Sequence, residues 1–323
     1  MKIGIVGSGF IIKDCLEAIK ESNKIEVGSV CVRENSLDKA RKFMDEYGIS
    51  KVYTDYDDFL RDREIEFVYI GIINSLHYSY AKKALEHNKN VICEKPFTEN
   101  SEELKELIEI AKEKRLYLFE AITTIHLENF VYIKENISKL GEIKIVQCNF
   151  SQYSSRYDKY KNGEVLPVFD PKLNGGALYD INIYNIHLVA GLFGEPKNIE
   201  YFGNKGFNGV DTSGILILDY DKFKAVCIGA KDSGSPNFII IQGDEGYIKI
   251  NSATNLIGNI EVSFNKKVDE INNNVYNNRM TREFLNFKNI FDTDNFIEME
   301  KLLNHSFLVM KMLEKAKKSF ENK

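Results

Sequence analysis

Two separated segments carry the side chains best suited to move protons and to bind a small polar molecule. The first is Glu94-Lys95-Pro96, which follows an apolar run. The second covers residues 175–187, in which Asp180, Tyr184 and His187 stand at i, i+4 and i+7. On an α-helix this spacing places a carboxylate, a phenol and an imidazole on one face. Groups of these types serve in general acid–base catalysis, so both segments are candidate parts of an active site.

A glycine-rich turn near the N-terminus predicts a dinucleotide site. It follows the short apolar strand Lys2–Gly7 and opens a predicted helix from Phe10 to Ser22. Two glycines here let the backbone turn tightly and approach a pyrophosphate, which then lies against the positive end of the helix. Ile12 stands where the full G-x-G-x-x-G pattern has its third glycine, and it could push the helix away from the strand. The residues assigned to cofactor binding in this turn are Gly7, Ser8, Gly9, Phe10 and Ile11.

The end of the second predicted strand, Glu26–Val32, bears on the choice between NAD and NADP. An acidic residue there accepts a hydrogen bond from the ribose 2′-hydroxyl of NAD, whereas an arginine accommodates the 2′-phosphate of NADP. Arg33 and Glu34 follow this strand. Arg33 could form a forked, charge-assisted contact with the phosphate, while Glu34 could repel the phosphate or face water. We expect NADP as the preferred cofactor, with NAD as the alternative.

The elements that must position these residues follow two patterns. Through about residue 120, apolar strands alternate with amphipathic helices, which is typical of parallel strands joined by right-handed crossovers. From Ile199 onward, closely spaced strands predict an antiparallel-rich sheet, and two helices end the chain. We therefore expect an α/β fold: a doubly wound Rossmann domain over residues 1–120 and an α+β domain with a large open sheet over residues 121–323. Because the carboxyl ends of parallel strands face the ligand crevice, the first domain would deliver Lys95 to the cofactor.

Composition places the chain among globular proteins and argues against several partners. The 323 residues carry a formal net charge of −5, and 43% of them are hydrophobic. With no dense basic stretch and no apolar run of about 20 residues, we expect neither a nucleic-acid partner nor a membrane span. The five cysteines are widely spaced, as in reduced cytoplasmic proteins, and the five histidines show no metal-ligand spacing. We therefore predict a cytoplasmic protein without a metal site.

These motifs together resemble the Gfo/Idh/MocA family of oxidoreductases over nearly the whole chain. The resemblance rests on Glu94-Lys95-Pro96, on Asn74-Ser75-Leu76-His77 and on the Gly-Gly-Ala-Leu-x-Asp segment at residues 175–180. Tyr184 and Glu120-Ala121 are similar to the branch that contains glucose–fructose oxidoreductase and dimeric dihydrodiol dehydrogenase. The resemblance therefore implies that this chain is an NAD(P)-dependent oxidoreductase.

The resemblance implies that Lys95 contacts the substrate hydroxyl and the nicotinamide ribose, and that Tyr184 is the acid–base. Oxidation of an alcohol needs a base for the hydroxyl proton while a hydride leaves for the nicotinamide. A free tyrosine has a pKa of about 10, and a neighbouring ammonium lowers that value toward neutrality. Asp180 could orient Lys95 or Tyr184 and balance their charge. We also expect a cis peptide before Pro96, which would fix the direction of the lysine.

Further cofactor contacts come from the loops that follow the predicted strands. The resemblance implies them for Asn74, His77 and Glu94, although His77 could instead cap the helix turn that follows it. The sequence departs from the family at Ile72-Ile73, where Thr-Pro is common, and at Asn182, where glycine is usual. The first departure bears on loop stiffness under the cofactor, and the second on the shape of the substrate pocket.

A sugar, polyol or cyclic diol is the substrate that the resemblance implies. His187, Arg156 and Tyr153 are candidate substrate contacts, together with Tyr157 and Tyr160 of the same polar loop. The loop residues could equally lie at the surface, and His187 could be a satisfied histidine on a helix face. The resemblance also implies a homodimer or homotetramer that forms through the exposed face of the C-terminal sheet.

Two other functions stay open from the sequence. A dinucleotide-sensing regulator would bind the cofactor and change its affinity for a partner without hydride transfer. A lyase-type or hydrolytic enzyme could keep the cofactor bound for an internal redox cycle. The presence of both Lys95 and Tyr184 favours the dehydrogenase over the regulator.

Overall fold

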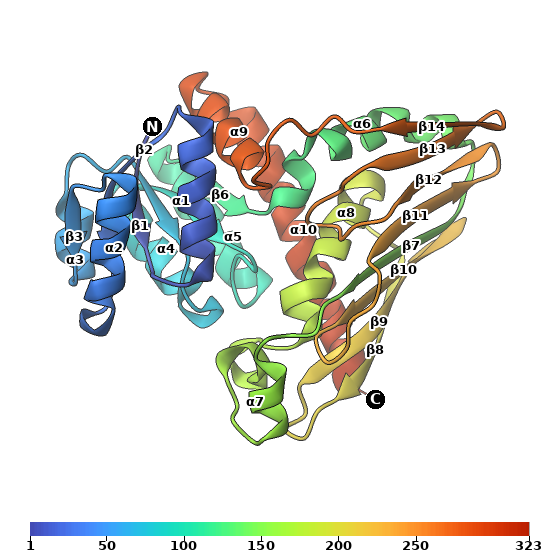
Figure 1. Ribbon diagram of the computed structural model, residues 1–323, viewed down its shortest axis with the longest axis horizontal. Coiled ribbons are helices and arrows are strands. Elements are labelled where there is room, and N and C mark those ends of the chain that lie inside the picture. The colour runs from blue at the N-terminus through green and yellow to red at the C-terminus, as the bar shows by residue number, and fades with distance from the viewer. Residues whose placement is uncertain (323) are drawn as a thin grey trace. The chain divides into compact units, whose positions relative to one another are not determined.

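The computed structural model describes residues 1–322, which form two compact units (Figure 1). Unit 1 comprises Met1–Ile122 and Tyr276–Phe307, and unit 2 comprises Thr123–Val275 and the described chain from Leu308 on. Residues 276–307, which we expected in the second domain, belong to unit 1 because α9 (Thr281–Asp292) packs on α1 (Phe10–Ser22). Hydrogen bonds join the two helices, since Thr281 donates to the Glu21 carboxylate at 2.6 Å.

Unit 1 is built on a six-stranded sheet with the order β3-β2-β1-β4-β5-β6. Every neighbouring pair is parallel, and this strand order defines the Rossmann fold, so the predicted doubly wound sheet is confirmed. The strands are β1 (Lys2–Val6), β2 (Glu26–Cys31), β3 (Lys51–Tyr53), β4 (Phe67–Ile70), β5 (Asn90–Glu94) and β6 (Leu118–Ala121).

The helices of unit 1 begin and end at signals that are visible in the sequence. The helix that ends at Tyr47 stops at Gly48, whose φ of 71° lies in the left-handed region. Asn100 caps the next long helix, since its side-chain oxygen accepts the amide of Glu103 at 2.9 Å. Besides α1 and α9, the α-helices are α2 (Leu37–Tyr47), α3 (Tyr56–Arg61), α4 (His77–Glu86) and α5 (Ser101–Lys114), with 3₁₀ turns at Glu34–Ser36 and Asn74–Leu76.

Unit 2 contains an eight-stranded sheet with the order β14-β13-β12-β11-β7-β10-β9-β8 (Figure 1). The predicted antiparallel-rich sheet is confirmed, but β7 lies at its centre and pairs in parallel with β10, so the strands are not one continuous meander. The strands are β7 (Ile143–Ser151), β8 (Asn198–Lys205), β9 (Asp211–Tyr220), β10 (Phe223–Ala230), β11 (Phe238–Gly243), β12 (Gly246–Ile250), β13 (Ile260–Phe264) and β14 (Lys267–Ile271).

The two faces of this sheet differ because side chains alternate along each strand. The buried face, on which α8 packs, includes Cys148, Leu216 and Cys227, whereas Ile145 and Ile215 are exposed on the other. The α-helices are α6 (Glu128–Asn136), α7 (Tyr157–Lys161), α8 (Ile183–Phe193) and α10 (Phe296–Glu321), which starts in unit 1; 3₁₀ turns cover Thr123–His126, Ile137–Leu140, Pro167–Phe169 and Pro171–Leu173.

Several expectations from composition can be compared with the structure. All five cysteines are buried thiols, as the sequence predicted. Among residues 1–322, no helix is long and apolar enough to cross a membrane. Within the same residues, no three side chains of metal-binding type gather where an ion could be held. The expected cytoplasmic location stays a prediction.

Candidate active site

The turn between β1 and α1 has the geometry that a pyrophosphate requires. Gly7 has a φ of 123°, and a side chain there would clash with the carbonyl oxygen of Gly71, so only glycine fits. A Cβ at Gly9 would meet no atom within 4 Å, which leaves the backbone open to a ligand. The first turn of α1 carries no acidic side chain and has no side-chain cap. The residues of this turn therefore fit a dinucleotide phosphate at the helix N-terminus.

Ile12, the residue in place of the third glycine, occupies space that a neighbouring glycine leaves open. Its side chain is fully buried and lies where a Cβ on Gly71 would be. Gly71, directly after β4, has no side chain, and the side chain of Ile12 fills the space that this leaves between helix and strand. Arg33 and Glu34, which follow β2, are both exposed to solvent. The preference for NADP stays a prediction.

The loops after β4 and β5 are joined through His77. Its Nδ1 lies 2.8 Å from the carbonyl oxygen of Pro96, and its Nε2 lies 3.2 Å from that of Ile72. Burial lowers the pKa of His77, so the ring is neutral and one nitrogen donates at a time. This imidazole fixes the backbone beside Lys95, a role that the sequence did not reveal. The cofactor contacts expected of His77 and Asn74 stay predictions.

Lys95 extends from the carboxyl end of β5, and the Lys95–Pro96 peptide is cis as predicted. Lys95 is half-buried, while the preceding Glu94 is only 7% exposed. The Glu94 carboxylate accepts the Tyr69 hydroxyl at 2.6 Å and the Lys95 amide at 3.3 Å. Burial raises the pKa of Glu94, whereas the charges of Lys95 and Arg279 lower it. Glu94 therefore interacts with Lys95 in two ways: its negative charge attracts the ammonium, and its carboxylate accepts the backbone amide of Lys95.

Two further buried acids surround Glu94, and the sequence did not reveal them as neighbours. Burial raises the pKa of Glu120, on β6, to about 7. Glu283, on α9, is fully buried, and its carboxyl oxygens have no hydrogen-bond partner within residues 1–322. Burial raises the pKa of Glu283 well above its usual value, and the charge of Glu94 raises it further. Burial in unit 1 thus favours the protonated, uncharged form of both carboxyl groups.

The raised pKa of Glu120 predicts a pH-dependent stability of unit 1. The pKa of Glu120 is higher in the folded protein than in the unfolded chain. The contribution of the protonated carboxyl group to the free energy of unfolding is therefore fully present below about pH 4.5 and is lost as the pH rises through about 7. Glu120→Gln removes this titration and should raise the free energy of unfolding by up to roughly 3 kcal/mol at about pH 8, with little change at about pH 5. Urea unfolding at both pH values tests this. Glu113→Gln, an exposed change on α5, is the control, and an equal effect of Glu120→Gln at both pH values would contradict the assignment.

In unit 2, the helix that we expected to carry Asp180, Tyr184 and His187 has a different start from a regular α-helix. A π-helical turn covers Leu178–Asn182, and α8 follows from Ile183. The turn is held by the sheet, since the Asp211 carboxylate accepts the amide of Leu178 at 2.7 Å and the Asn182 side chain donates to the carbonyl of Cys227 at 3.1 Å. These bonds accommodate the wider turn, which is common at functional sites. Asn182, where the family has glycine, therefore has a structural role.

The π turn changes the expected polar stripe of Asp180, Tyr184 and His187. Asp180 is partly exposed, and its carboxylate forms an ion pair with Lys231. Tyr184 is 7% exposed, and its ring centroid lies 5.8 Å from that of Phe150 on β7. His187 is fully buried. The roles expected of these three residues stay predictions, but the partner of Asp180 is a residue that the sequence analysis missed. The sequence did contain a pattern that could have identified Lys231, because this lysine directly follows an apolar strand, as Lys95 does.

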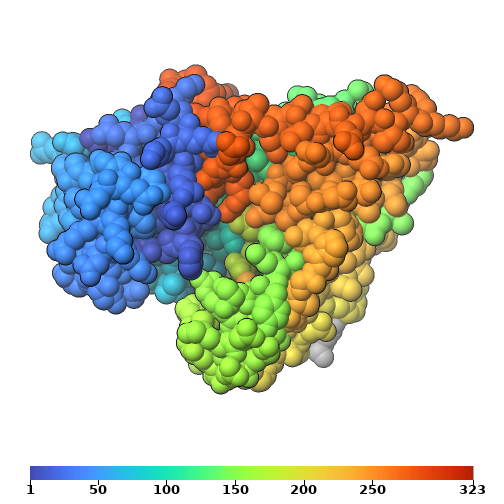
Figure 2. Space-filling view, viewed as in Figure 1, coloured from blue at the N-terminus to red at the C-terminus, as the bar shows by residue number. Residues whose placement is uncertain are grey.

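The polar loop of residues 151–172 forms a lobe with its own core, which Figure 2 shows in green. Tyr160, expected as a possible substrate contact, is 2% exposed and packs with Phe169 in this core, so its ring is structural. Tyr153 and Arg156 are exposed, and the Tyr153 hydroxyl donates to Asp158 at 2.6 Å. Substrate binding by Tyr153 and Arg156 stays a prediction.

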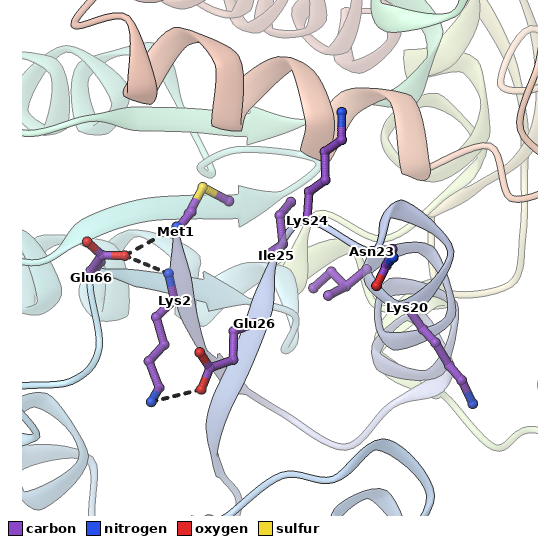
Figure 3. Close-up of a pocket in the computed structure, with 9 residues that line it drawn as sticks. Met1, Lys2, Lys20, Asn23, Lys24, Ile25, Glu26 and Glu66 are labelled. Carbon is purple, nitrogen blue, oxygen red and sulfur yellow. Dashed lines mark hydrogen bonds and ion pairs between the residues drawn. The ribbon is translucent and has the colours of Figure 1, made fainter.

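A pocket at the amino-terminal edge of the Rossmann sheet is separate from these residues (Figure 3). Lys2 lies between two acids there: its ammonium pairs with Glu26 at 2.9 Å, and its amide donates to Glu66 at 2.6 Å. The charges join the start of β1 to β2 and to the segment before β4. We therefore interpret this pocket as structural.

A glycine turn on a Rossmann sheet, with a lysine at the end of β5, defines a dinucleotide-binding oxidoreductase domain. The model of the oxidoreductase family with an NAD-binding Rossmann fold matches residues 1–121, and that of the GFO/IDH/MocA C-terminal domain matches residues 131–249. The chain belongs to the Gfo/Idh/MocA family of oxidoreductases, as the sequence predicted.

Several named oxidoreductases are similar in sequence to this chain. The chain is 34% identical over 252 residues to the scyllo-inositol 2-dehydrogenase (NADP(+)) IolU of Bacillus subtilis, covering 78% of this chain and 76% of the relative. It is 34% identical to the uncharacterized oxidoreductase YgjR of Escherichia coli over 77% of this chain and 76% of the relative. It is 30% identical to trans-1,2-dihydrobenzene-1,2-diol dehydrogenase of Xenopus tropicalis over 78% and 75%.

Solved structures share the fold at low sequence identity. A levoglucosan dehydrogenase in complex with NADH and levoglucosan superposes with a TM-score of 0.85 at 17% identity, covering 100% of this chain and 97% of that one. The 3-ketoreductase KijD10 of Actinomadura kijaniata in complex with NADP gives a TM-score of 0.82 at 18% identity, with coverage of 99% and 97%. These matches confirm the predicted fold class.

Proposed function

We propose that this oxidoreductase moves a hydride between NAD(P) and a CH–OH or carbonyl carbon of a sugar, polyol or cyclic diol. The observation that carries the proposal is Lys95 at the carboxyl end of β5, in the same sheet as the open turn at Gly9. Ligands of doubly wound sheets bind at this edge. The names of the relatives, which include an inositol dehydrogenase and dihydrodiol dehydrogenases, favour polyols and diols.

Lys95 and Tyr184 are the proposed catalytic residues. The bound nicotinamide supplies or accepts the hydride. In oxidation, Tyr184 takes the proton of the substrate hydroxyl, and the ammonium of Lys95 favours the phenolate that does so. In reduction, Lys95 stabilises the negative charge that develops on the carbonyl oxygen, and Tyr184 returns the proton. Burial of Tyr184 against Phe150 limits its rotation, which favours a fixed direction of proton transfer.

A spectroscopic assay separates the candidate functions. The enzyme is mixed with NADP or NAD and with scyllo-inositol, levoglucosan or trans-1,2-dihydrobenzene-1,2-diol, and the absorbance of reduced nicotinamide is followed. Net formation of reduced cofactor supports the dehydrogenase. A binding signal without turnover supports the dinucleotide-sensing regulator, and loss of substrate without net reduction supports the internal redox cycle.

Arg33 is the proposed determinant of NADP preference. Arg33→Ala should raise the KM for NADP by about 10- to 100-fold, because a charge-assisted contact to a phosphate is lost, while the KM for NAD changes little. Steady-state kinetics with each cofactor measures this ratio, and Arg63→Ala, a change before β4, is the control. An unchanged ratio of the two KM values would show that Arg33 does not determine the cofactor preference.

We also propose a homodimer or homotetramer that forms through the outer face of the eight-stranded sheet. The strands β8, β9 and β10 place apolar side chains side by side there, with Ile215 on β9 opposite both Ile228 on β10 and Phe202 on β8. Light scattering should show a dimer or tetramer that Ile215→Lys dissociates, since a buried interface rejects an unpartnered charge. Val275→Lys, an exposed change outside the sheet, should leave the assembly intact, and a monomeric wild type would contradict the proposal.

A further inference from the structure

A buried lysine, Lys231, lies in unit 2 outside the motifs on which the resemblance to the family rests. Lys231 is 4% exposed and directly follows β10. Lysine is almost never fully buried unless it is paired, because its ammonium loses its hydration. Its partner is the Asp180 carboxylate in the π turn, and the two groups form an ion pair.

The backbone and surroundings of Lys231 fix the direction of its side chain. Its amide donates to the carbonyl of Thr212 on β9 at 2.8 Å, and its own carbonyl accepts the amide of Ser154 at 2.8 Å. The ammonium lies 5.7 Å from the ring centroid of Phe169, at a distance typical of a cation–π contact. The cation is therefore held in place by the sheet and by the lobe core.

Lys231 and Asp180 differ in their exposure to solvent, and this difference shows from which side each residue enters the ion pair. The side chain of Lys231 is 5% exposed, whereas that of Asp180 is 31% exposed. The ammonium therefore approaches Asp180 from the protein interior, while about a third of the Asp180 side chain is exposed. A carboxylate accepts several hydrogen bonds, so the exposed part of Asp180 can accept one from a hydroxyl.

We propose that Lys231 is a positioning residue, which holds the Asp180 carboxylate as a hydrogen-bond acceptor for a substrate hydroxyl beside the reacting carbon. The inference rests on the proposed function and deepens it. Without Lys231, a substrate that covers Asp180 would strip water from a carboxylate without its cation, which is costly. With the ion pair present, the site suits a neutral polyol or diol with neighbouring hydroxyls better than an anionic substrate.

The test compares Lys231→Met, Lys231→Arg and Lys224→Met on whichever substrate of the panel turns over best. Lys224 lies on β10, the strand that Lys231 follows, and pairs with Asp219 at 2.6 Å, so Lys224→Met is a control that also removes a lysine–aspartate pair. We expect Lys231→Met to lower kcat/KM at least about tenfold, mainly through KM, because substrate binding is affected. Lys231→Arg should recover most of this loss, and Lys224→Met should behave as wild type.

A substrate analogue that lacks the neighbouring hydroxyl separates positioning from a merely structural role. The missing hydroxyl should reduce kcat/KM in the wild type much more than in Lys231→Met. Fluorescence titration with NADPH should give the same affinity in both proteins, which shows that Lys231→Met is folded; if it is not, Lys231→Arg and Asp180→Asn carry the comparison with the same analogue. Two results would overturn this inference and leave the proposed function intact. One is that wild type and Lys231→Met discriminate equally between substrate and analogue, and the other is that kcat/KM of Lys231→Met lies within twofold of wild type. Absence of turnover by the wild type would remove the proposed function and the inference with it.

Discussion

Lys95→Met should abolish turnover while leaving the dinucleotide bound. The substitution keeps the length of the side chain and removes its charge, so the carboxyl end of β5 and the buried Glu94 beneath it can retain their places. A donor aimed at developing oxyanion charge typically contributes a factor of about 10²–10³ to kcat. Lys95 would also favour the phenolate of Tyr184, so we expect a loss of about 10³-fold or more. Steady-state kinetics and NADPH titration measure the two effects separately.

The affinity of Lys95→Met for NADPH should stay within about tenfold of wild type, or about 1.4 kcal/mol, because most of the dinucleotide contacts come from the glycine turn. Lys114→Met, an exposed change at the end of α5, is the matched control. Near-normal turnover by Lys95→Met would show that the proposed role of Lys95 is wrong. Loss of cofactor binding would instead give Lys95 a binding role.

Tyr184→Phe should lower kcat by about 10²–10⁴-fold, the range in which a general acid–base acts. The variant keeps the ring that packs against Phe150 and loses only the hydroxyl, so its free energy of unfolding should change by about 1 kcal/mol. Rate and urea unfolding are measured on the same preparation. Lys95→Met and Tyr184→Phe should combine non-additively if the two residues act on one proton transfer.

Tyr220→Phe is the control for this second variant. The Tyr220 hydroxyl donates to the carbonyl of Gly194 at 2.8 Å, so the control also removes a hydrogen-bonded tyrosine hydroxyl from unit 2, here from a half-buried side chain. We expect it to affect stability and to leave the rate unchanged. If Tyr184→Phe behaves as this control does, Tyr184 is a packing residue and another group must move the proton.

The sequence was sufficient where the decisive interactions are local. The limits of α1 depend on neighbouring residues and were predicted, and the stop of α2 at Gly48 and the cap at Asn100 are local signals of the same kind. The open turn at Gly9 and the position of Lys95 after β5 follow from the same local patterns. For this reason the Rossmann domain and its cofactor class could be predicted with little error.

Features that depend on distant residues were missed. The π turn before α8 exists because Asp211 and Cys227, on two later strands, supply its hydrogen bonds. Glu283 lies beside Glu94 because α9 returns to unit 1, which the chain order did not indicate. Lys231 and Asp180, which are 51 positions apart in the chain, likewise meet only in the folded protein. No helical or strand periodicity encodes such contacts, so the partners around the candidate site came from the structure.

Isotope transfer tests the central claim most directly. A panel substrate that carries deuterium on the carbon bearing its hydroxyl is incubated with the enzyme and oxidised cofactor, and the reduced cofactor is analysed by mass spectrometry. Direct hydride transfer predicts one deuterium in each reduced nicotinamide, together with a slower rate than that of the unlabelled substrate. Reduced cofactor without deuterium, or no net reduction with any member of the panel, would contradict the account.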